Sequence, residues 1–271
     1  MIAAGHYCAF FGAAGISAVT HTPPEVSVLA PELNPRQLTG REESHLVALP
    51  SGHRLQAQAA AAFQALQDDA RSAGFDLAIA SSFRSYSRQL AIWNGKARGE
   101  RKVHDDAGRE VLVSALPGPQ RLRAILRYSA IPGTSRHHWG TDLDVYDAAA
   151  LPADYRLELS PAEVAPGGLF DPLHRWLDER MAAGESCGFY RPYALDRGGV
   201  APERWHLSYA PLSVACASRV TARLLMDCWG DCPAGEEPVL LAEEIRAFLP
   251  QLMANYLAVG VDWCPAPAHF A

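Results

Sequence analysis

The chain has 271 residues, a formal net charge of −6 and an ordinary globular composition, with 49% hydrophobic and 20% charged residues. This length is enough for one large domain or two small ones. A mildly acidic chain without a block of like charge argues against a nucleic-acid-binding protein, which usually presents a basic patch to phosphates.

The N-terminal segment over residues 1–19 is apolar and carries no lysine or arginine. A secretory signal usually begins with a positively charged region, and a membrane span needs about 20 apolar residues, whereas Gly5, His6 and Ser17 interrupt this segment. We expect an extension that packs on the domain or stays mobile, with a degenerate export signal as the alternative, and no stable membrane span. The protein would be periplasmic or in the cell envelope if the segment directs export, and cytoplasmic otherwise.

Hydrophobic periodicity predicts helices and short strands in mixed order. Helices are expected over 54–72, from Tyr86 or Ser87 onward, and over 118–130, 171–184, 211–228 and 240–258. Strands are expected over 75–81, at the end of 135–147, and within 188–193 and 204–209. The charged stretch 99–115 should form a hairpin or an excursion loop, and 148–170 should form a loop. This order favours an α+β fold with an antiparallel sheet.

None of the six cysteines shows C-x-x-C spacing, so a zinc site built from cysteines is not expected. Cys228 and Cys232 flank a turn-like segment and could form a disulfide in an oxidising compartment. Ordinary buried thiols are the favoured alternative.

Three segments carry the candidate chemistry. They are SSFRSYSRQ at 81–89, SRHHWGTDLD at 135–144 and ERWH at 203–206. A hydrolytic zinc centre needs three histidine or carboxylate ligands, an open position for water and a separate acid/base group. A ligand set of His137, Asp144 and His206 is available, with Glu203 three residues before the last of these.

Spacing alone leaves alternatives for two of these ligands. Residues 142 and 144 point to the same face of the expected strand, so either Asp142 or Asp144 could bind the metal. His138 competes with His137 in the same way. Each residue also has a structural explanation, because a buried histidine is more often a hydrogen-bonded core residue than a ligand. Likewise, Arg84 could be a simple surface cation.

Together, S-x-H-x-x-G-x-x-x-D at 135–144 and E-x-W-H at 203–206 resemble the signature of VanY-type D-alanyl-D-alanine carboxypeptidases. This zinc peptidase group includes VanX-like dipeptidases, L,D-carboxypeptidases and some phage endolysins. The segment 81–89 is similar to the group's S-G-[YF]-R-S-x-x-x-Q motif, and the likeness covers roughly residues 40–210. Two departures are Ser82, where glycine is common, and Asp142, where many members have alanine.

The resemblance implies a role for each matching residue. It makes His137, Asp144 and His206 the zinc ligands, Glu203 the general base and then acid, and Arg84 the cation that stabilises the oxyanion. Ser135 and Gln89 would bind substrate. Because one arginine can hardly both stabilise the oxyanion and bind the terminal carboxylate in full, Ser135, Tyr190 or Tyr193 could share that carboxylate with Arg84.

The implied activity is zinc-dependent hydrolysis of the terminal D-Ala-D-Ala bond of peptidoglycan stem peptides. The alternatives are an L,D-carboxypeptidase, a cross-link endopeptidase of the same fold, and a non-catalytic zinc-binding module. We expect an N-terminal extension over 1–40, the zinc carboxypeptidase domain over 41–212 and a C-terminal helical appendage over 213–271. A monomer is the default expectation.

Overall fold

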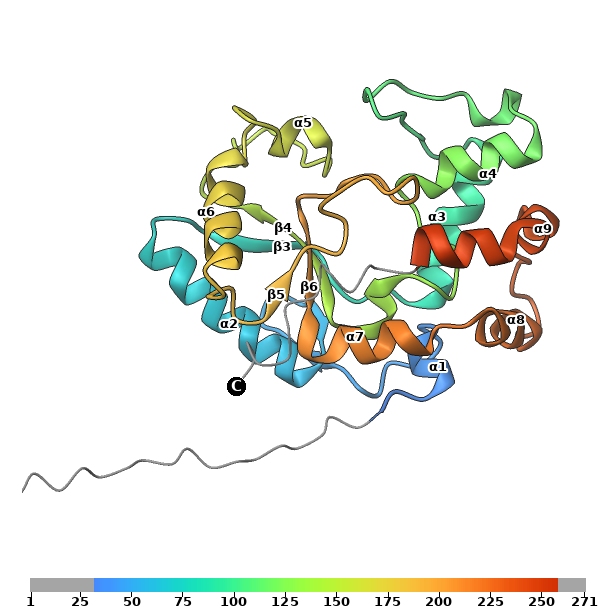
Figure 1. Ribbon diagram of the computed structural model, residues 1–271, viewed down its shortest axis with the longest axis horizontal. Helices are drawn as coiled ribbons and strands as arrows, with labels where there is room; N and C mark the ends of the chain where they lie inside the picture. Colours follow the sequence, from blue (N-terminus) through green and yellow to red (C-terminus); the bar gives the residue numbers. More distant parts are fainter. Residues whose placement is uncertain (1–31, 258–271) are drawn as a thin grey trace, which may run out of the picture. The chain divides into compact units, whose positions relative to one another are not determined.

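The computed structural model describes residues 32–257 of the chain (Figure 1). The expectations for an export signal, and for most of the N-terminal extension, lie outside the described residues. The end of the predicted C-terminal appendage lies outside them as well.

A four-stranded antiparallel sheet forms the centre of the fold, in the order β3-β4-β6-β5 (Figure 1). Its strands are β3 (Leu77–Ser81), β4 (Asp142–Asp147), β5 (Phe189–Tyr190) and β6 (His206–Tyr209). A separate two-stranded sheet pairs β1 (Val47–Ala48) with β2 (Arg54–Leu55). The predicted α+β fold with a small antiparallel sheet is confirmed.

Helices surround the sheet (Figure 1). The α-helices are α1 (Pro35–Leu38), α2 (Ala57–Ser72), α3 (Tyr86–Arg98), α4 (Gly118–Leu126), α5 (Pro161–Val164), α6 (Asp171–Ala182), α7 (Ala210–Arg219), α8 (Ala222–Gly230) and α9 (Ala242–Leu252). Short 3-10 turns form η1 (Val113–Ala115) and η2 (Arg136–Trp139), and a π-helical turn forms η3 (Met253–Leu257).

Three predicted helices differ from the observed ones. The helix expected over 118–130 ends at Leu126. The helix expected from residue 54 begins at Ala57, because Arg54 and Leu55 pair with β1 instead. The helix expected over 211–228 is divided into α7 and α8. The hydroxyl of Thr221 accepts a hydrogen bond from the amide of Leu224 at 3.1 Å, which caps the start of a second helix.

One face of the sheet packs against α2 and α6, with the strand residues Leu143, Val145 and Leu207 fully buried among them. Successive residues of a strand point to opposite faces. Asp142 and Asp144 in β4 and His206 in β6 therefore share the other face, as the spacing predicted for the two aspartates. Burial of the apolar face fixes which side chains reach the polar face.

A second apolar cluster joins α3, α4, α8 and α9. Trp93 in α3 is fully buried there, and its indole nitrogen donates to the carbonyl of Leu240 at 2.9 Å. The two C-terminal helices thus share a core with α3 and α4, and the division at residue 212 stays a prediction. Within residues 32–257, no helix has both the length and the apolar character that crossing a bilayer requires.

Candidate metal centre and its cavity

The turn from η2 into β4 brings the first two candidate ligands together. Gly140 ends η2 with a φ of 68°, a left-handed conformation that favours glycine. A Cβ on this residue would lie 2.2 Å from Cδ2 of Leu46 and 3.2 Å from the backbone nitrogen of Gln56, so the Leu46 side chain would have to move. The turn leaves His137 and Asp144 facing each other, with His137 Nε2 3.4 Å from Asp144 Oδ2.

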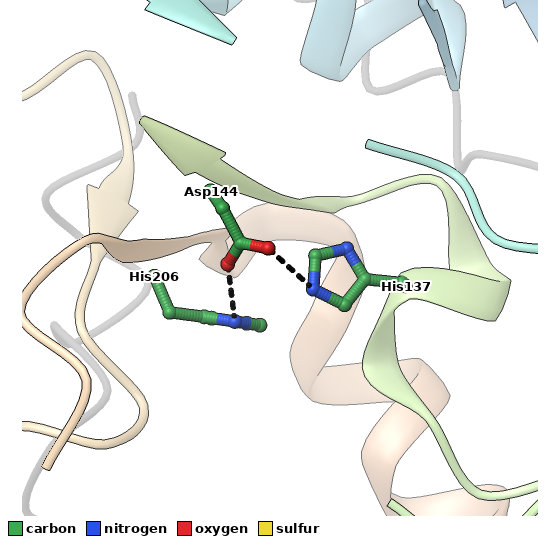
Figure 2. Close-up of side chains that lie close together, drawn as sticks. All are labelled: His137, Asp144 and His206. Atoms are coloured by element: carbon green, nitrogen blue, oxygen red, sulfur yellow. Dashed lines mark ion pairs between the residues drawn. The ribbon is translucent and has the colours of Figure 1, made fainter. Parts of the chain in front are cut away.

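Strand pairing supplies the third candidate ligand. The register of β4 and β6 places Asp144 opposite His206, and His206 Nδ1 lies 3.2 Å from Asp144 Oδ1. Figure 2 shows Asp144 between the two imidazoles. One ligand atom from each of His137, Asp144 and His206 lies within 4.8 Å of the others, and all three residues are buried.

Hydrogen bonds outside this group orient the two imidazoles. Nδ1 of His137 contacts the carbonyl oxygen of Ser82 at 2.8 Å. A carbonyl only accepts, so Nδ1 carries the proton and the Nε2 lone pair faces Asp144. Such an outer partner fixes the tautomer and orientation of a metal-binding histidine.

His206 is oriented by Asp142. Nε2 of His206 lies 3.0 Å from Asp142 Oδ1, which leaves the Nδ1 lone pair for the candidate centre. The guanidinium of Arg136 also donates to Asp142 Oδ1, at 2.7 Å, and the hydroxyl of Thr141 donates to Oδ2 at 2.6 Å. Burial opposes ionisation of Asp142, but Arg136 holds its pKa below the usual range. Burial likewise opposes protonation of His206, while its bonds to Asp142 and Asp144 raise its pKa to about 9. A metal that binds at Nδ1 would therefore displace a proton from this ring.

The sequence alternatives His138 and Asp142 lie outside the group of three. His138 is fully buried, its Nδ1 donates to the carbonyl of Arg84 at 2.6 Å, and its Nε2 accepts from the amide of Gly133 at 3.2 Å. Burial lowers the pKa of His138 to about 3, so it stays neutral and ties two loops together.

The donor set suits zinc. Two neutral imidazole nitrogens and one carboxylate are the ligands of open, hydrolytic zinc sites, and both imidazoles here have the outer hydrogen bonds that such ligands need. Harder ions such as calcium prefer an all-oxygen shell.

Glu203 lies beside this donor set. Its Oε2 is 3.5 Å from His206 Nδ1, and its side chain is 13% exposed. Burial raises the pKa of Glu203 to about 7, with His206 opposing that rise and Asp144 adding to it. The ring of Tyr193 lies edge-on to that of His206, with centroids 5.0 Å apart, and its carbonyl accepts from the amide of Glu203 at 2.9 Å. This carboxylate can therefore exchange a proton near neutral pH.

Arg84 is fixed by its own neighbours. Its amide donates to the carbonyl of His137 at 3.1 Å, and its guanidinium donates to Gln89 Oε1 at 2.9 Å and to Ser81 Oγ at 3.2 Å. Gln89 is fully buried, and its Nε2 donates to the carbonyl of Ala130 at 2.6 Å. The predicted substrate-binding role of Gln89 stays a prediction, and its observed contacts hold Arg84 in place. Ser135, also buried, lies at the start of η2.

A single family model covers more than half of the chain. Residues 52–212 match VanY, D-alanyl-D-alanine carboxypeptidase. The chain belongs to the VanY family. The matched range contains all three segments that carry the candidate chemistry, and it makes the protein a peptide hydrolase of the carboxypeptidase type.

Individual proteins are also similar to parts of this chain. An uncharacterised protein of Haemophilus influenzae is 53% identical over 104 residues, which is 37% of this chain and 71% of that protein. The structure of VanYB in complex with D-alanine-D-alanine is 22% identical with a TM-score of 0.45, covering 69% of this chain and 90% of that one. A vancomycin resistance D,D-pentapeptidase VanY variant in complex with Zn(II) is 23% identical with a TM-score of 0.45, covering 68% and 90%. Both structural similarities are too remote to bear on function.

The VanY-family site opens into a cavity of about 770 Å³. Its wall includes Arg84, Ser135, His137, Asp144, Tyr193, Glu203 and His206. Tyr190 lies behind the site, where its hydroxyl accepts from Arg136 at 2.9 Å. Two residues near the site belong to none of the recognised motifs as functional positions: Arg136, which pairs with Asp142 at 2.7 Å, and Lys96, which lines the cavity. The signal for Lys96 was its position seven residues after Gln89, which places both on one face of a helix.

Proposed function

We propose that this VanY-family chain is a zinc carboxypeptidase that hydrolyses the terminal D-Ala-D-Ala type bond of peptidoglycan stem peptides. The observation that carries the proposal is the position of Glu203. Its carboxylate lies 3.5 Å from the donor nitrogen of His206, beside the set of His137, Asp144 and His206, at the wall of a cavity large enough for a peptide end. A metal site with only a structural role does not require an acid/base group such as Glu203 beside its ligands.

In this proposal, His137 Nε2, an Asp144 oxygen and His206 Nδ1 hold the metal. When bound, zinc supplies Lewis acidity and lowers the pKa of a coordinated water to about 7. Glu203 accepts a proton from the attacking water and then delivers it to the leaving amine. A pKa of about 7 suits both halves of this task, because the group loses and regains a proton with little bias.

Arg84 stabilises the negative charge that develops on the former carbonyl oxygen. The guanidinium is held by Gln89 and Ser81, so little reorganisation is needed as the charge forms. One well-placed donor contributes on the order of 3–4 kcal/mol to such a step. Ser135 is assigned to the substrate side, because it lies in the cavity wall next to the residues of η2.

The family description supplies the substrate class, a peptide that ends in D-alanyl-D-alanine. An L,D-carboxypeptidase and a cross-link endopeptidase would use the same donors with differently shaped pockets. A panel of pentapeptide, tetrapeptide and cross-linked stems, each assayed for released D-alanine with and without a chelator, separates the three activities.

The decisive variant is Glu203→Gln, which keeps the shape of the side chain and removes its basicity. We expect zinc content equal to that of the wild type and a loss of turnover of at least about 100-fold. Glu158→Gln is the matched control, because Glu158 is an exposed carboxylate in the same cavity wall. Wild-type turnover by Glu203→Gln would refute the role of Glu203, and a wild-type protein inactive on the whole panel would refute the enzyme assignment.

A further inference from the structure

The cavity contains a cation that the proposed mechanism does not use. Among 24 lysines and arginines, only Lys96 and Lys102 are lysines. Lys102 is 72% exposed and pairs with Glu110 at 3.1 Å. Both lysines lie in the cavity wall. Lys96, on α3, is partly buried and shares that wall with Arg84 and Glu203, and no carboxylate of residues 32–257 pairs with it.

The ammonium of Lys96 has unused hydrogen-bonding capacity. Its Nζ donates to Ser129 Oγ at 2.6 Å, and that hydroxyl donates in turn to the carbonyl of Tyr128 at 2.7 Å. An ammonium has three N–H groups. Residues 32–257 offer Lys96 no other hydrogen bond and no carboxylate within 4.0 Å, so two donors remain for a ligand.

The Lys96 ammonium interacts electrostatically with Glu203 and Arg84. Burial lowers the pKa of Lys96 to about 8, while the charge of Glu203 opposes that change and the charge of Arg84 adds to it. A partly buried cation without an ion pair is unfavourable until an anion arrives. The two remaining N–H groups and the positive charges of Arg84 and Arg101 favour an anionic group of the bound peptide, whereas the charge of Glu203 opposes it.

Contacts along α3 connect the ammonium to Arg84. Gln89 bonds Arg84 with one end of its amide and the carbonyl of Ala130 with the other, and Ser129, which bonds Lys96, is the residue before Ala130. Arg84 and Lys96 therefore both line the wall, and the fully buried Gln89 connects them from behind it. A carboxypeptidase must both stabilise an oxyanion and bind a free carboxylate, and one arginine cannot fully meet both demands.

We propose that Lys96 and Ser129 form a carboxylate-binding subsite for the peptide, which leaves Arg84 free to act on the oxyanion. This inference rests on the proposed carboxypeptidase function. Two carboxylates of a stem peptide share the required chemistry, the terminal carboxylate of the released residue and the side-chain carboxylate of a diamino-dicarboxylic acid.

Two peptide pairs distinguish the sources. One pair has a terminal acid or a terminal amide, and the other has a diaminopimelate-type or a lysine-type residue at the same position. For wild type, we expect kcat/KM to favour the carboxylate-bearing member of one pair. In Lys96→Met that preference should fall roughly 10–100-fold, mostly through KM, as for the loss of a charged hydrogen bond. Lys102→Met, which removes the exposed lysine, should keep the preference.

A collapse of the preference for one pair supports the subsite and names the carboxylate that it binds. A preference unchanged in both pairs overturns the proposal, including the case in which Lys96→Met lowers all activities uniformly.

Chemical labelling tests the same subsite without turnover. Acylation of the two lysines with an amine-reactive reagent is followed by mass spectrometry in Glu203→Gln, with and without the carboxylate-bearing peptide. The peptide should protect Lys96 at least several-fold more than Lys102, which also lines the cavity but pairs with Glu110. Equal labelling of Lys96 with and without peptide refutes the subsite. Because this assay needs no hydrolysis, it separates a failure of the subsite from a failure of the enzyme assignment.

Discussion

Replacing Asp142 by alanine should weaken zinc binding although Asp142 is not a proposed ligand. Its carboxylate accepts from Nε2 of His206 at 3.0 Å and so directs the Nδ1 lone pair toward the metal position. Loss of such an outer partner costs 10–100-fold in metal affinity, which is about 1.4–2.7 kcal/mol.

The same substitution has a separate effect on folding. Arg136, whose side chain is 4% exposed, would lose its carboxylate and keep the hydroxyls of Tyr190 and Ser208 and the ring of Trp139 as neighbours. Removing one partner of a buried ion pair destabilises a protein by about 3–5 kcal/mol. Urea unfolding of the metal-free protein should therefore show a lower free energy of unfolding for Asp142→Ala.

A double variant separates the two effects. In Asp142→Ala with Arg136→Met, no buried charge is left unpaired, so most of the stability should return. The zinc affinity should stay low, because His206 still lacks its acceptor. Competition with a chromophoric chelator measures that affinity in each variant.

Glu236→Ala is the matched control. It removes the carboxylate from Arg41, whose side chain is 5% exposed, at a place that contains none of the proposed ligands. It should lower stability and leave zinc affinity unchanged. If Asp142→Ala bound zinc as tightly as wild type, the role assigned to Asp142 would be refuted.

Three further predictions concern the ligands, the oxyanion and the pH dependence of stability. His206→Ala should lose most of its zinc by metal analysis of the purified protein, and full zinc content would contradict its assignment as a ligand. Arg84→Lys should keep its zinc and lose roughly 100–1000-fold in kcat, because a point charge cannot replace the planar guanidinium, and near-normal turnover would exclude the oxyanion role. Burial lowers the pKa of the fully buried His174 to about 3. Below pH ~6.5 the unfolded chain therefore binds one more proton than the folded protein. As the pH decreases from this value, the free energy of unfolding should decrease by about 1.4 kcal/mol per pH unit. His174→Leu should remove this part of the pH dependence in urea unfolding at pH 7 and pH 5, and equal slopes for both proteins would contradict it.

Much of the fold could be predicted because its elements are short and locally encoded. The helix expected near Tyr86 begins at Tyr86, where the hydroxyl of Ser85 accepts from the amide of Arg88 and caps it. The division of 211–228 into two helices was missed, because apolar periodicity continues across the break and only the cap at Thr221 signals it. Helix termini depend on single hydrogen bonds that periodicity does not report.

The candidate site was likewise only partly predictable from the sequence. Strand alternation predicted that Asp142 and Asp144 share a face, but the choice between them depends on which one meets Arg136 and which one lies opposite His206. Lys96 and Ser129 come from an α-helix and a distant loop, and no spacing rule connects them. Residue spacing in one sequence does not predict contacts between segments that lie far apart along the chain.

The alternation within β4 and β6 also acts as a check on assembly. Leu143 lies opposite Leu207 and Asp144 lies opposite His206. The same pairing of β4 with β6 therefore aligns both the apolar and the polar side chains. A slip of one residue would expose the leucines and press the aspartates and the histidine into the apolar layer of α2 and α6. Burial of the apolar face therefore disfavours a misaligned sheet even in the metal-free protein. Only the correctly aligned sheet brings the three donor side chains together.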